Sequence, residues 1–91
     1  MNTNEATARI RTELKRLCPT LSVRHGTGTA YCWVHIRGSG EGHGFNPTEF
    51  SALAAVGLSP GRNYCVISPD ETDRWVERLE TRAWDQPVHV G

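Results

Sequence analysis

Between residues 31 and 37, side chains suited to molecular recognition occupy every second position. They are Tyr31, Trp33, His35 and Arg37, and Arg24 joins them if the preceding strand pairs in register. Residues two apart in a β-strand point to the same side, so the spacing predicts one face with two aromatic rings, an imidazole and a guanidinium. Tyr, Trp and Arg are enriched at the energetic centres of protein interfaces, and aromatic rings beside arginine also stack nucleic-acid bases. The pattern therefore indicates binding to a protein or to a nucleic acid.

A glycine-rich loop follows this stretch. In Gly38–Gly44, glycine alternates with Ser39, Glu41 and His43, which is typical of a flexible connector or of a loop that grips a partner. Backbone N–H groups of such a loop can cradle a phosphate, but the lysine and the spacing of a P-loop are missing. Glu41 also places a negative charge where an anion would bind. We therefore assign Glu41 and His43 to a partner-binding surface.

The histidines and cysteines lack the spacing of a metal site. The candidates are His25, His35, His43 and Cys32. Zinc ligands usually occur in pairs at short spacing, whereas Cys32 and His35 are three apart on a predicted strand and face opposite sides. His25 and His35 can approach each other across a hairpin, but two ligands do not complete a site. We expect neither a metal nor another cofactor.

The residues that could act as nucleophiles lack the partners that catalysis requires. Cys65 lies in an apolar stretch and is expected to be buried, and Ser39 is not in a G-x-S-x-G motif. The clustered carboxylates share a predicted helix with Arg74, Arg78 and Arg82, and such a face is usually solvated and held by local ion pairs. We expect no catalytic residues and no enzymatic activity.

Composition limits the chain to one small domain. Its 91 residues are 37% hydrophobic and 22% charged, with no net charge, which fits a globular domain and argues against purely electrostatic nucleic-acid binding. The charge is unevenly distributed. Residues 1–45 carry six basic and three acidic side chains, a net +3, and residues 46–91 carry four and seven, a net −3. Such a division can orient a partner or a second copy.

Cysteine usage and the absence of targeting signals indicate a cytoplasmic protein. Three cysteines, an odd number without a C-x-x-C motif, fit a reducing compartment. We recognise no signal peptide, and no apolar run approaches the length of a membrane span. We therefore expect a cytoplasmic location and no membrane contact, and the sequence leaves the oligomeric state open.

The chain up to Arg37 is predicted to form a helix and then a hairpin. Thr3 or Asn4 caps a helix over residues 5–17, with an Arg9–Glu13 ion pair. Strands 21–25 and 29–37 follow, joined by a turn at Gly26–Gly28. The apolar stripe of the helix is Ala6, Ile10, Leu14 and Leu17. The residues of the second strand expected under the helices are Ala30, Cys32, Val34 and Ile36.

The second half is predicted to form a helix, a strand and a helix. Asn46-Pro47-Thr48-Glu49 reads as a capping box opening a helix that buries Phe50, Leu53 and Ala54 and ends at Gly57. Strand 63–67 precedes a second capping box, Ser68 to Glu71. The last helix presents one stripe, Thr72, Trp75, Val76, Leu79 and Ala83. Residues 85–91 are expected to form a frayed tail.

These elements predict an α+β fold in a single domain, residues 1–91, with an ordered core over 5–84. The order is αββαβα. Three helices with one apolar stripe each can cover one face of a three-stranded, mainly antiparallel sheet. We therefore expect the helices on one face and the aromatic residues on the other, uncovered face.

The pattern also resembles a known family. Ile10-Arg11, Leu14-Lys15, Leu21-Ser22-Val23-Arg24 and Trp33-Val34-His35-Ile36 are similar to a small domain of the large polyvalent proteins of phages and conjugative elements. The similarity covers roughly residues 9–37, and this module would stand alone rather than within a giant chain. The resemblance implies a non-enzymatic counter-defence inhibitor, anti-CRISPR-like, that occludes a host protein or ribonucleoprotein complex in the host cytoplasm. A nucleic-acid-binding module using the aromatic face is the alternative.

Overall fold

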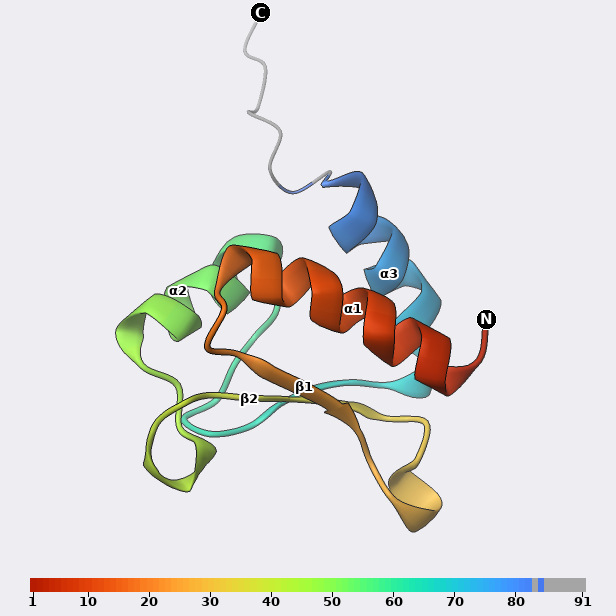
Figure 1. The fold of residues 1–91 in the computed structure, drawn as a ribbon, viewed down its shortest axis with the longest axis horizontal. Helices are drawn as coiled ribbons and strands as arrows, with labels where there is room; N and C mark the ends of the chain where they lie inside the picture. Colours follow the sequence, from red (N-terminus) through yellow and green to blue (C-terminus); the bar gives the residue numbers. More distant parts are fainter. Residues whose placement is uncertain (83, 85–91) are drawn as a thin grey trace, which may run out of the picture.

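The chain folds into three helices and a three-stranded antiparallel sheet, in the order helix–strand–strand–helix–strand–helix (Figure 1). This confirms the predicted α+β fold class and element order. The structure is a computed structural model and describes residues 1–82 and 84. The predicted tail, 85–91, and Ala83 of the last apolar stripe lie outside the described residues. The elements are α1 (Thr3–Leu17), β1 (Ser22–His25), β2 (Val34–Arg37), α2 (Pro47–Val56), β3 (Cys65–Ile67) and α3 (Thr72–Thr81).

The sheet has β2 in its centre, with β1 and β3 as its edges. The register pairs Val23 with Ile36 across β1 and β2, and Val34 with Ile67 across β2 and β3. These four side chains are at most 2% exposed. In Figure 1 all three helices lie on the same side of the sheet, so the core lies between the sheet and the helices. The opposite side of the sheet carries no helix among the described residues.

Helix α1 buries most of its predicted stripe. Ala6, Ile10 and Leu14 are buried, but Leu17 is 38% exposed, so its predicted burial is wrong. Leu17 is the last residue of the helix, and after it the chain turns so that Cys18 occupies the core instead. The helix is capped by the Asn2 side chain, which accepts from the Glu5 N–H, and not by Thr3 or Asn4.

Arg9 connects α1 to α3 and does not pair with Glu13 as predicted. Its Nε donates to Glu80 Oε2 at 2.7 Å, and its guanidinium also lies 3.7 Å from Glu5. The long arginine side chain reaches the neighbouring helix, where a bidentate contact with a carboxylate is stronger than a pair along one helix face. Arg9 and Glu80 therefore join the middle of α1 to the C-terminal end of α3.

The predicted long second strand is only partly correct. Residues 34–37 form β2, but Gly28–Ala30 forms a 3₁₀ turn, in which the Ala30 N–H donates to the Thr27 carbonyl at 3.0 Å. The Trp33 N–H likewise donates back to Ala30. These local hydrogen bonds satisfy backbone groups of residues 27–33, which are therefore not paired with β1 as a strand. Consequently Ala30 is half-buried and Cys32 is exposed, which corrects their predicted position under the helices.

Helix α2 begins and ends where predicted, yet it buries a different face. Asn46 and Glu49 form the capping box, and Gly57 ends the helix with a φ of 99°. Phe50 is 46% exposed and Ala54 is exposed, so their predicted burial is wrong. The residues that α2 buries are Glu49, Leu53 and Val56. The Glu49 carboxylate thus lies on the buried side of the helix.

The last strand and helix are shorter than predicted. Strand β3 covers only Cys65–Ile67, and Tyr64 is 61% exposed. The predicted second capping box does not form, because Pro69–Glu71 is a 3₁₀ turn and the Ser68 side chain makes no capping bond. The Ser68 carbonyl instead accepts from the Thr72 hydroxyl at 2.9 Å. The inward stripe of α3 is Thr72, Val76 and Leu79, with Trp75 partly buried beside it.

Within the described part of the chain, no helix has both the length and the apolar character that crossing a bilayer requires.

Candidate binding face of the sheet

The uncovered side of the sheet carries the polar and basic residues of the strands. His35 of β2 lies between Arg24 of β1 and Val66 of β3. Arg37 pairs with Ser22 one step further along. Because side chains alternate along each strand and the neighbouring positions are buried in the core, these residues point away from the helices. We call this surface the outer face.

Trp33 and Tyr64 extend the outer face beyond the strands. The Gly26 N–H donates to the Trp33 carbonyl at 2.9 Å, which continues the β1–β2 pairing and keeps Trp33 in phase with His35. Trp33 is 38% exposed. Continuing the β2–β3 register by one residue places Tyr64 opposite Arg37, and the two residues line one hollow. Tyr64 was missed as a site residue, although its two-residue spacing from Val66 could have indicated it.

Tyr31 does not belong to the outer face, contrary to the prediction. It ends the 3₁₀ turn, and its ring lies 4.5 Å from the His25 ring, centroid to centroid. Its hydroxyl donates to Asn4 Oδ1 in α1 at 3.1 Å. The two-residue alternation applies only within a strand, and residue 31 lies before β2 begins. Tyr31 therefore joins the hairpin turn to the start of α1.

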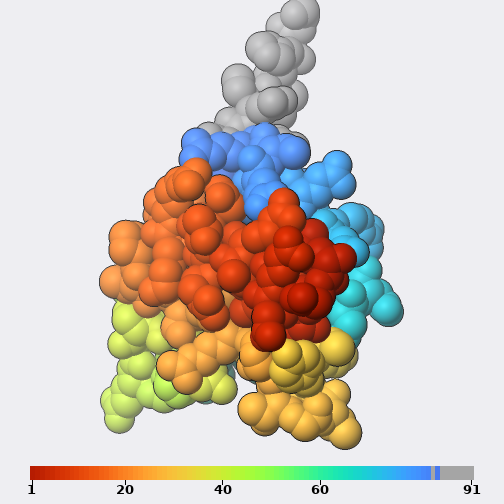
Figure 2. All heavy atoms as spheres, turned by 45° about the vertical axis from the view of Figure 1, so that its right-hand side comes forward, coloured from red at the N-terminus to blue at the C-terminus, as the bar shows by residue number. Residues whose placement is uncertain are grey.

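Two loops frame the outer face. Figure 1 shows the turns around residues 28–30 and 41–43 at opposite ends of β2, both on the side of the sheet away from the helices. In Figure 2 the same segments, gold and yellow-green, are separate lobes beneath α1 with a recess between them. Each loop borders a hollow, one of about 280 Å³ beside Gly26 and Ala30 and one of about 330 Å³ beside Gly42 and His43. His35 and Arg37 line both hollows.

The predicted glycine loop is held by backbone hydrogen bonds. The Gly38 N–H donates to the His43 carbonyl, and the Gly40 N–H donates to the Gly44 carbonyl, both at 2.9 Å. A Cβ atom at Gly38 would collide with the Gly44 backbone, so this close approach requires glycine. His43 borders the hollow beside the sheet. Glu41 is exposed at the start of the 3₁₀ turn and does not line that hollow.

The outer face carries cations without carboxylate partners. In the part of the chain that the structure describes, neither Arg24 nor Arg37 forms an ion pair or a side-chain hydrogen bond. The His35 Nε2 atom is buried and likewise has no hydrogen-bond partner among the described residues. Unpaired arginines on a sheet that no helix covers give a surface suited to anionic groups.

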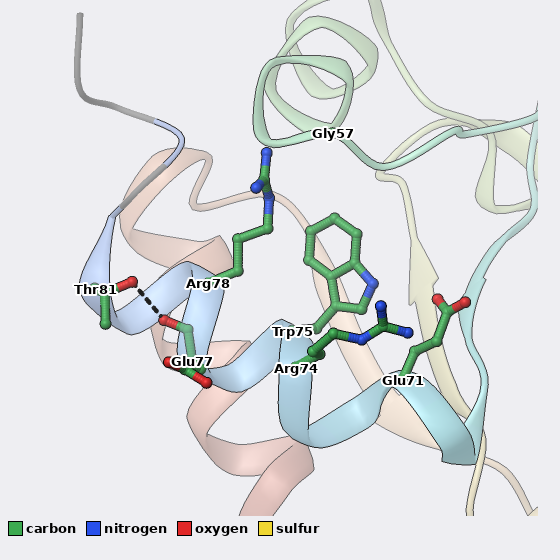
Figure 3. A pocket seen from close by; sticks show the side chains of 7 residues that line it. All are labelled: Gly57, Glu71, Arg74, Trp75, Glu77, Arg78 and Thr81. Atoms are coloured by element: carbon green, nitrogen blue, oxygen red, sulfur yellow. Dashed lines mark hydrogen bonds between the residues drawn. The ribbon is translucent and has the colours of Figure 1, made fainter.

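A larger hollow lies elsewhere, against α3. It measures about 490 Å³, and Figure 3 shows Arg74, Trp75 and Arg78 extending into it from α3, near Glu71 and Gly57. Arg78 donates from Nε to the Val56 carbonyl at 2.8 Å and lies 5.7 Å from the Trp75 ring centroid. Arg78 thus connects α3 to the end of α2. Glu71 and Glu77 also line the hollow. The surface of this hollow therefore carries both acidic and basic side chains and is not mainly cationic.

The histidines and cysteines that were weighed as metal ligands or nucleophiles lie in separate places. Among residues 1–82 and 84, no three His, Cys, Asp or Glu side chains gather at metal-binding distance. Cys65 is buried as predicted, and burial raises the pKa of its thiol to about 11, so the reactive thiolate is scarce at neutral pH. Cys32 is exposed on the turn before β2.

Comparison of this chain with models of protein families, with curated proteins and with solved structures gives no match.

Proposed function

We propose that this chain is a non-enzymatic binding protein whose outer face docks on an acidic surface of a partner protein. The observation that carries the proposal is the pair Arg24 and Arg37, which have no carboxylate partner in the described structure. Arg37 lines one hollow with the exposed Tyr64, and the exposed Trp33 lies directly before β2. Arg, Trp and Tyr are the residues most enriched at the energetic centres of protein interfaces.

The cation type favours a protein partner over a nucleic acid. Lys15 is the single lysine among ten lysines and arginines, and it lies on α1, in the helix layer. Protein interfaces are enriched in Arg and depleted in Lys, whereas nucleic-acid surfaces generally use several cations of both types along the backbone. With only two arginines, the outer face supplies directional contacts rather than a continuous basic track.

The partner class that we propose is a host protein or ribonucleoprotein complex. This part of the proposal rests on the resemblance of residues 9–37 to the phage polyvalent-protein domain, and it makes the chain a counter-defence, anti-CRISPR-like inhibitor acting in the host cytoplasm. Inhibition by occlusion needs only a stable surface contact and no catalytic group.

A nucleic-acid-binding function is the second candidate. It is favoured by the same exposed rings, Trp33 and Tyr64, on a sheet that no helix covers, because aromatic rings on open sheets stack unpaired bases. The two functions make different predictions for simple anionic probes.

The test is a fluorescence anisotropy titration with labelled probes of equal charge: polyglutamate, a single-stranded oligonucleotide and a duplex. We expect polyglutamate to bind more tightly than either oligonucleotide. Tighter binding of an oligonucleotide by tenfold or more would support the second candidate instead, and binding of none of the probes would contradict an anion-binding outer face.

Reversing the charge of the two arginines tests whether polyglutamate binds to the outer face. We expect the double variant Arg24→Glu, Arg37→Glu to lose polyglutamate affinity by tenfold or more, because it removes both unpaired cations. The matched control is Lys15→Glu, Arg16→Glu, which makes the same change in net charge at two exposed residues of α1. Equal losses in the two double variants would show that net charge alone, and not the outer face, attracts the probe.

The counter-defence role is tested in bacteria that carry an active CRISPR system. Expression of the wild-type chain should restore phage plating, and the Arg24→Glu, Arg37→Glu variant should not. Undiminished CRISPR protection with the wild-type chain expressed would contradict this role in that host.

A further inference from the structure

Glu49 is a fully buried carboxylate that is held by hydrogen bonds. Its side chain is 0% exposed, and no ion pair involves it within the described residues. The carboxylate accepts hydrogen bonds from the Thr20 hydroxyl at 2.6 Å, the Asn46 N–H at 2.8 Å and the Ser39 N–H at 3.0 Å. Burial of an unpaired charge is costly unless hydrogen bonds replace its water, and here three donors do so.

The three donors come from separate segments of the chain. Thr20 lies in the turn between α1 and β1, Asn46 caps α2, and Ser39 lies in the glycine loop at the end of β2. A capping box needs only the bond to Asn46. The bonds to Thr20 and Ser39 are additional, and the second of them attaches the glycine loop to the body of the domain.

We infer that Glu49 is the positioning residue of the outer face, because its carboxylate holds the 38–44 loop that forms one wall of that face. This inference rests on the proposed function. The loop is closed on itself through Gly38 and Gly40, and the Ser39 amide between them donates to both Glu49 oxygens, at 3.0 and 3.2 Å. A loop held in this way presents His43 beside Arg37 before a partner arrives, and preorganisation of this kind raises affinity by lowering the ordering cost of binding.

The protonation state supports this role. Burial by itself would raise the pKa of Glu49, but the hydrogen bonds from Thr20, Asn46 and Ser39 outweigh burial and lower that pKa below its ordinary value. The side chain is therefore an anion at neutral pH and accepts from all three donors at once.

Amide hydrogen exchange of the variant Glu49→Gln tests the inference without any partner. Glutamine keeps the size of the side chain but replaces one carboxylate oxygen with an NH₂ donor, so the Ser39 N–H can keep at most one of its two bonds to residue 49. The Asn46 side-chain bond to the residue 49 N–H remains. We expect exchange at Ser39, Gly40 and Gly44 to become about tenfold faster, while the paired amides of Arg24 and His35 in the hairpin change much less.

Two further variants complete the design. Thr20→Val removes one donor and leaves the Ser39 bond, so loop exchange should stay close to wild type. Glu49→Asp keeps the charge but shortens the side chain by one methylene, and it should show the same loop-specific effect even if Glu49→Gln does not fold. Unchanged loop exchange in the folded Glu49 variants, or equal acceleration of loop and hairpin amides, would overturn the inference, since the second result would mean that Glu49 only stabilises the whole domain.

Binding of polyglutamate separates the inference from the proposed function. We expect Glu49→Gln to weaken binding about fivefold at pH 7, although Glu49 is buried and does not touch the probe. If the wild-type chain does not bind polyglutamate, the proposed function fails, and the exchange result still decides whether Glu49 holds the loop. If loop exchange rises and affinity is unchanged, Glu49 holds the loop but does not position the outer face.

Discussion

At the scale of single residues, the three cysteines have different environments. Cys32 is exposed on the turn before β2, and Cys18 and Cys65 are buried. We predict that a thiol reagent such as Ellman's reagent labels one cysteine per chain rapidly in native buffer and the other two only after unfolding, because reactivity requires access and thiolate character. Mass spectrometry of the labelled peptide should identify Cys32. Protection of Cys32 in native buffer would mean that its side chain is buried under the helices, as the sequence predicted.

Glu49 makes a second prediction at this scale. Its folded-state pKa lies below the ordinary value of 4.5, so ionised Glu49 stabilises the fold at pH values above 4.5. That contribution is lost as the pH falls below 4.5 through the folded-state pKa. We predict that Glu49→Gln lowers the free energy of unfolding by about 2 kcal/mol at pH 7, and that the difference from wild type shrinks at pH 3.

Urea unfolding at the two pH values measures this difference. The pKa of Glu80 is also lowered, by its hydrogen bond to Arg9, but Glu80 is present in both proteins and cancels in the comparison. A difference that is the same at pH 3 and pH 7 would mean that the charge of Glu49 does not contribute to stability.

Single residues also show the limits of inference from sequence. His35 and Arg37 were placed together from their spacing, and both belong to β2, where the alternation applies. Trp33 lies one residue before β2 and is joined to the hairpin by the Gly26–Trp33 backbone bond. Tyr31 has the same spacing but lies in a 3₁₀ turn, where alternation no longer applies. The binding role of these residues stays a prediction. The buried position of Glu49 was not anticipated, since its capping-box role is visible in sequence but its bonds to Thr20 and Ser39 depend on tertiary contacts.

At the scale of elements, the ends of α2 were more predictable than the face that it buries. Asn46, Pro47 and Gly57 define the ends of α2 through local backbone chemistry, so they could be read from sequence. The face of α2 could not, because a short apolar helix has no clear stripe and a glutamate is not expected on the buried side. Likewise, the turn after β1 could not be sized from Gly26 and Gly28 alone, since a tight turn and a 3₁₀ turn both use glycine.

Gly57 provides a prediction for α2. Its φ of 99° is unfavourable for any residue with a Cβ, and a Cβ there would lie 3.1 Å from the Arg78 guanidinium. We predict that Gly57→Ala lowers the free energy of unfolding by about 1–2 kcal/mol. The control is Gly28→Ala, where φ is 59° and nothing lies within 4 Å of the added Cβ, so a smaller loss is expected. Chemical denaturation compares the two, and a larger loss at Gly28 would contradict the role of Arg78 in packing against this helix end.

At the scale of the whole molecule, the layered arrangement separates two surfaces. The helix layer buries its apolar stripes against one side of the sheet, and the helices themselves are joined by the Arg9–Glu80 contact and by Arg78. The other side of the sheet carries two arginines, Arg24 and Arg37, between two loops, and neither has a carboxylate partner among the described residues. This separation could be predicted from the count of apolar stripes, because three short helices cannot cover both faces of a sheet.

The central claim is that binding occurs on the outer face and not in the larger hollow against α3. The most direct test is a titration of the ¹⁵N-labelled protein with polyglutamate, followed by ¹H–¹⁵N NMR. We predict that the largest shift changes occur at Arg24, His35, Arg37 and His43, with the amides of α3 nearly unchanged. Shift changes centred on Arg74, Trp75 and Arg78, with the outer face silent, would contradict the account and assign binding to the α3 hollow.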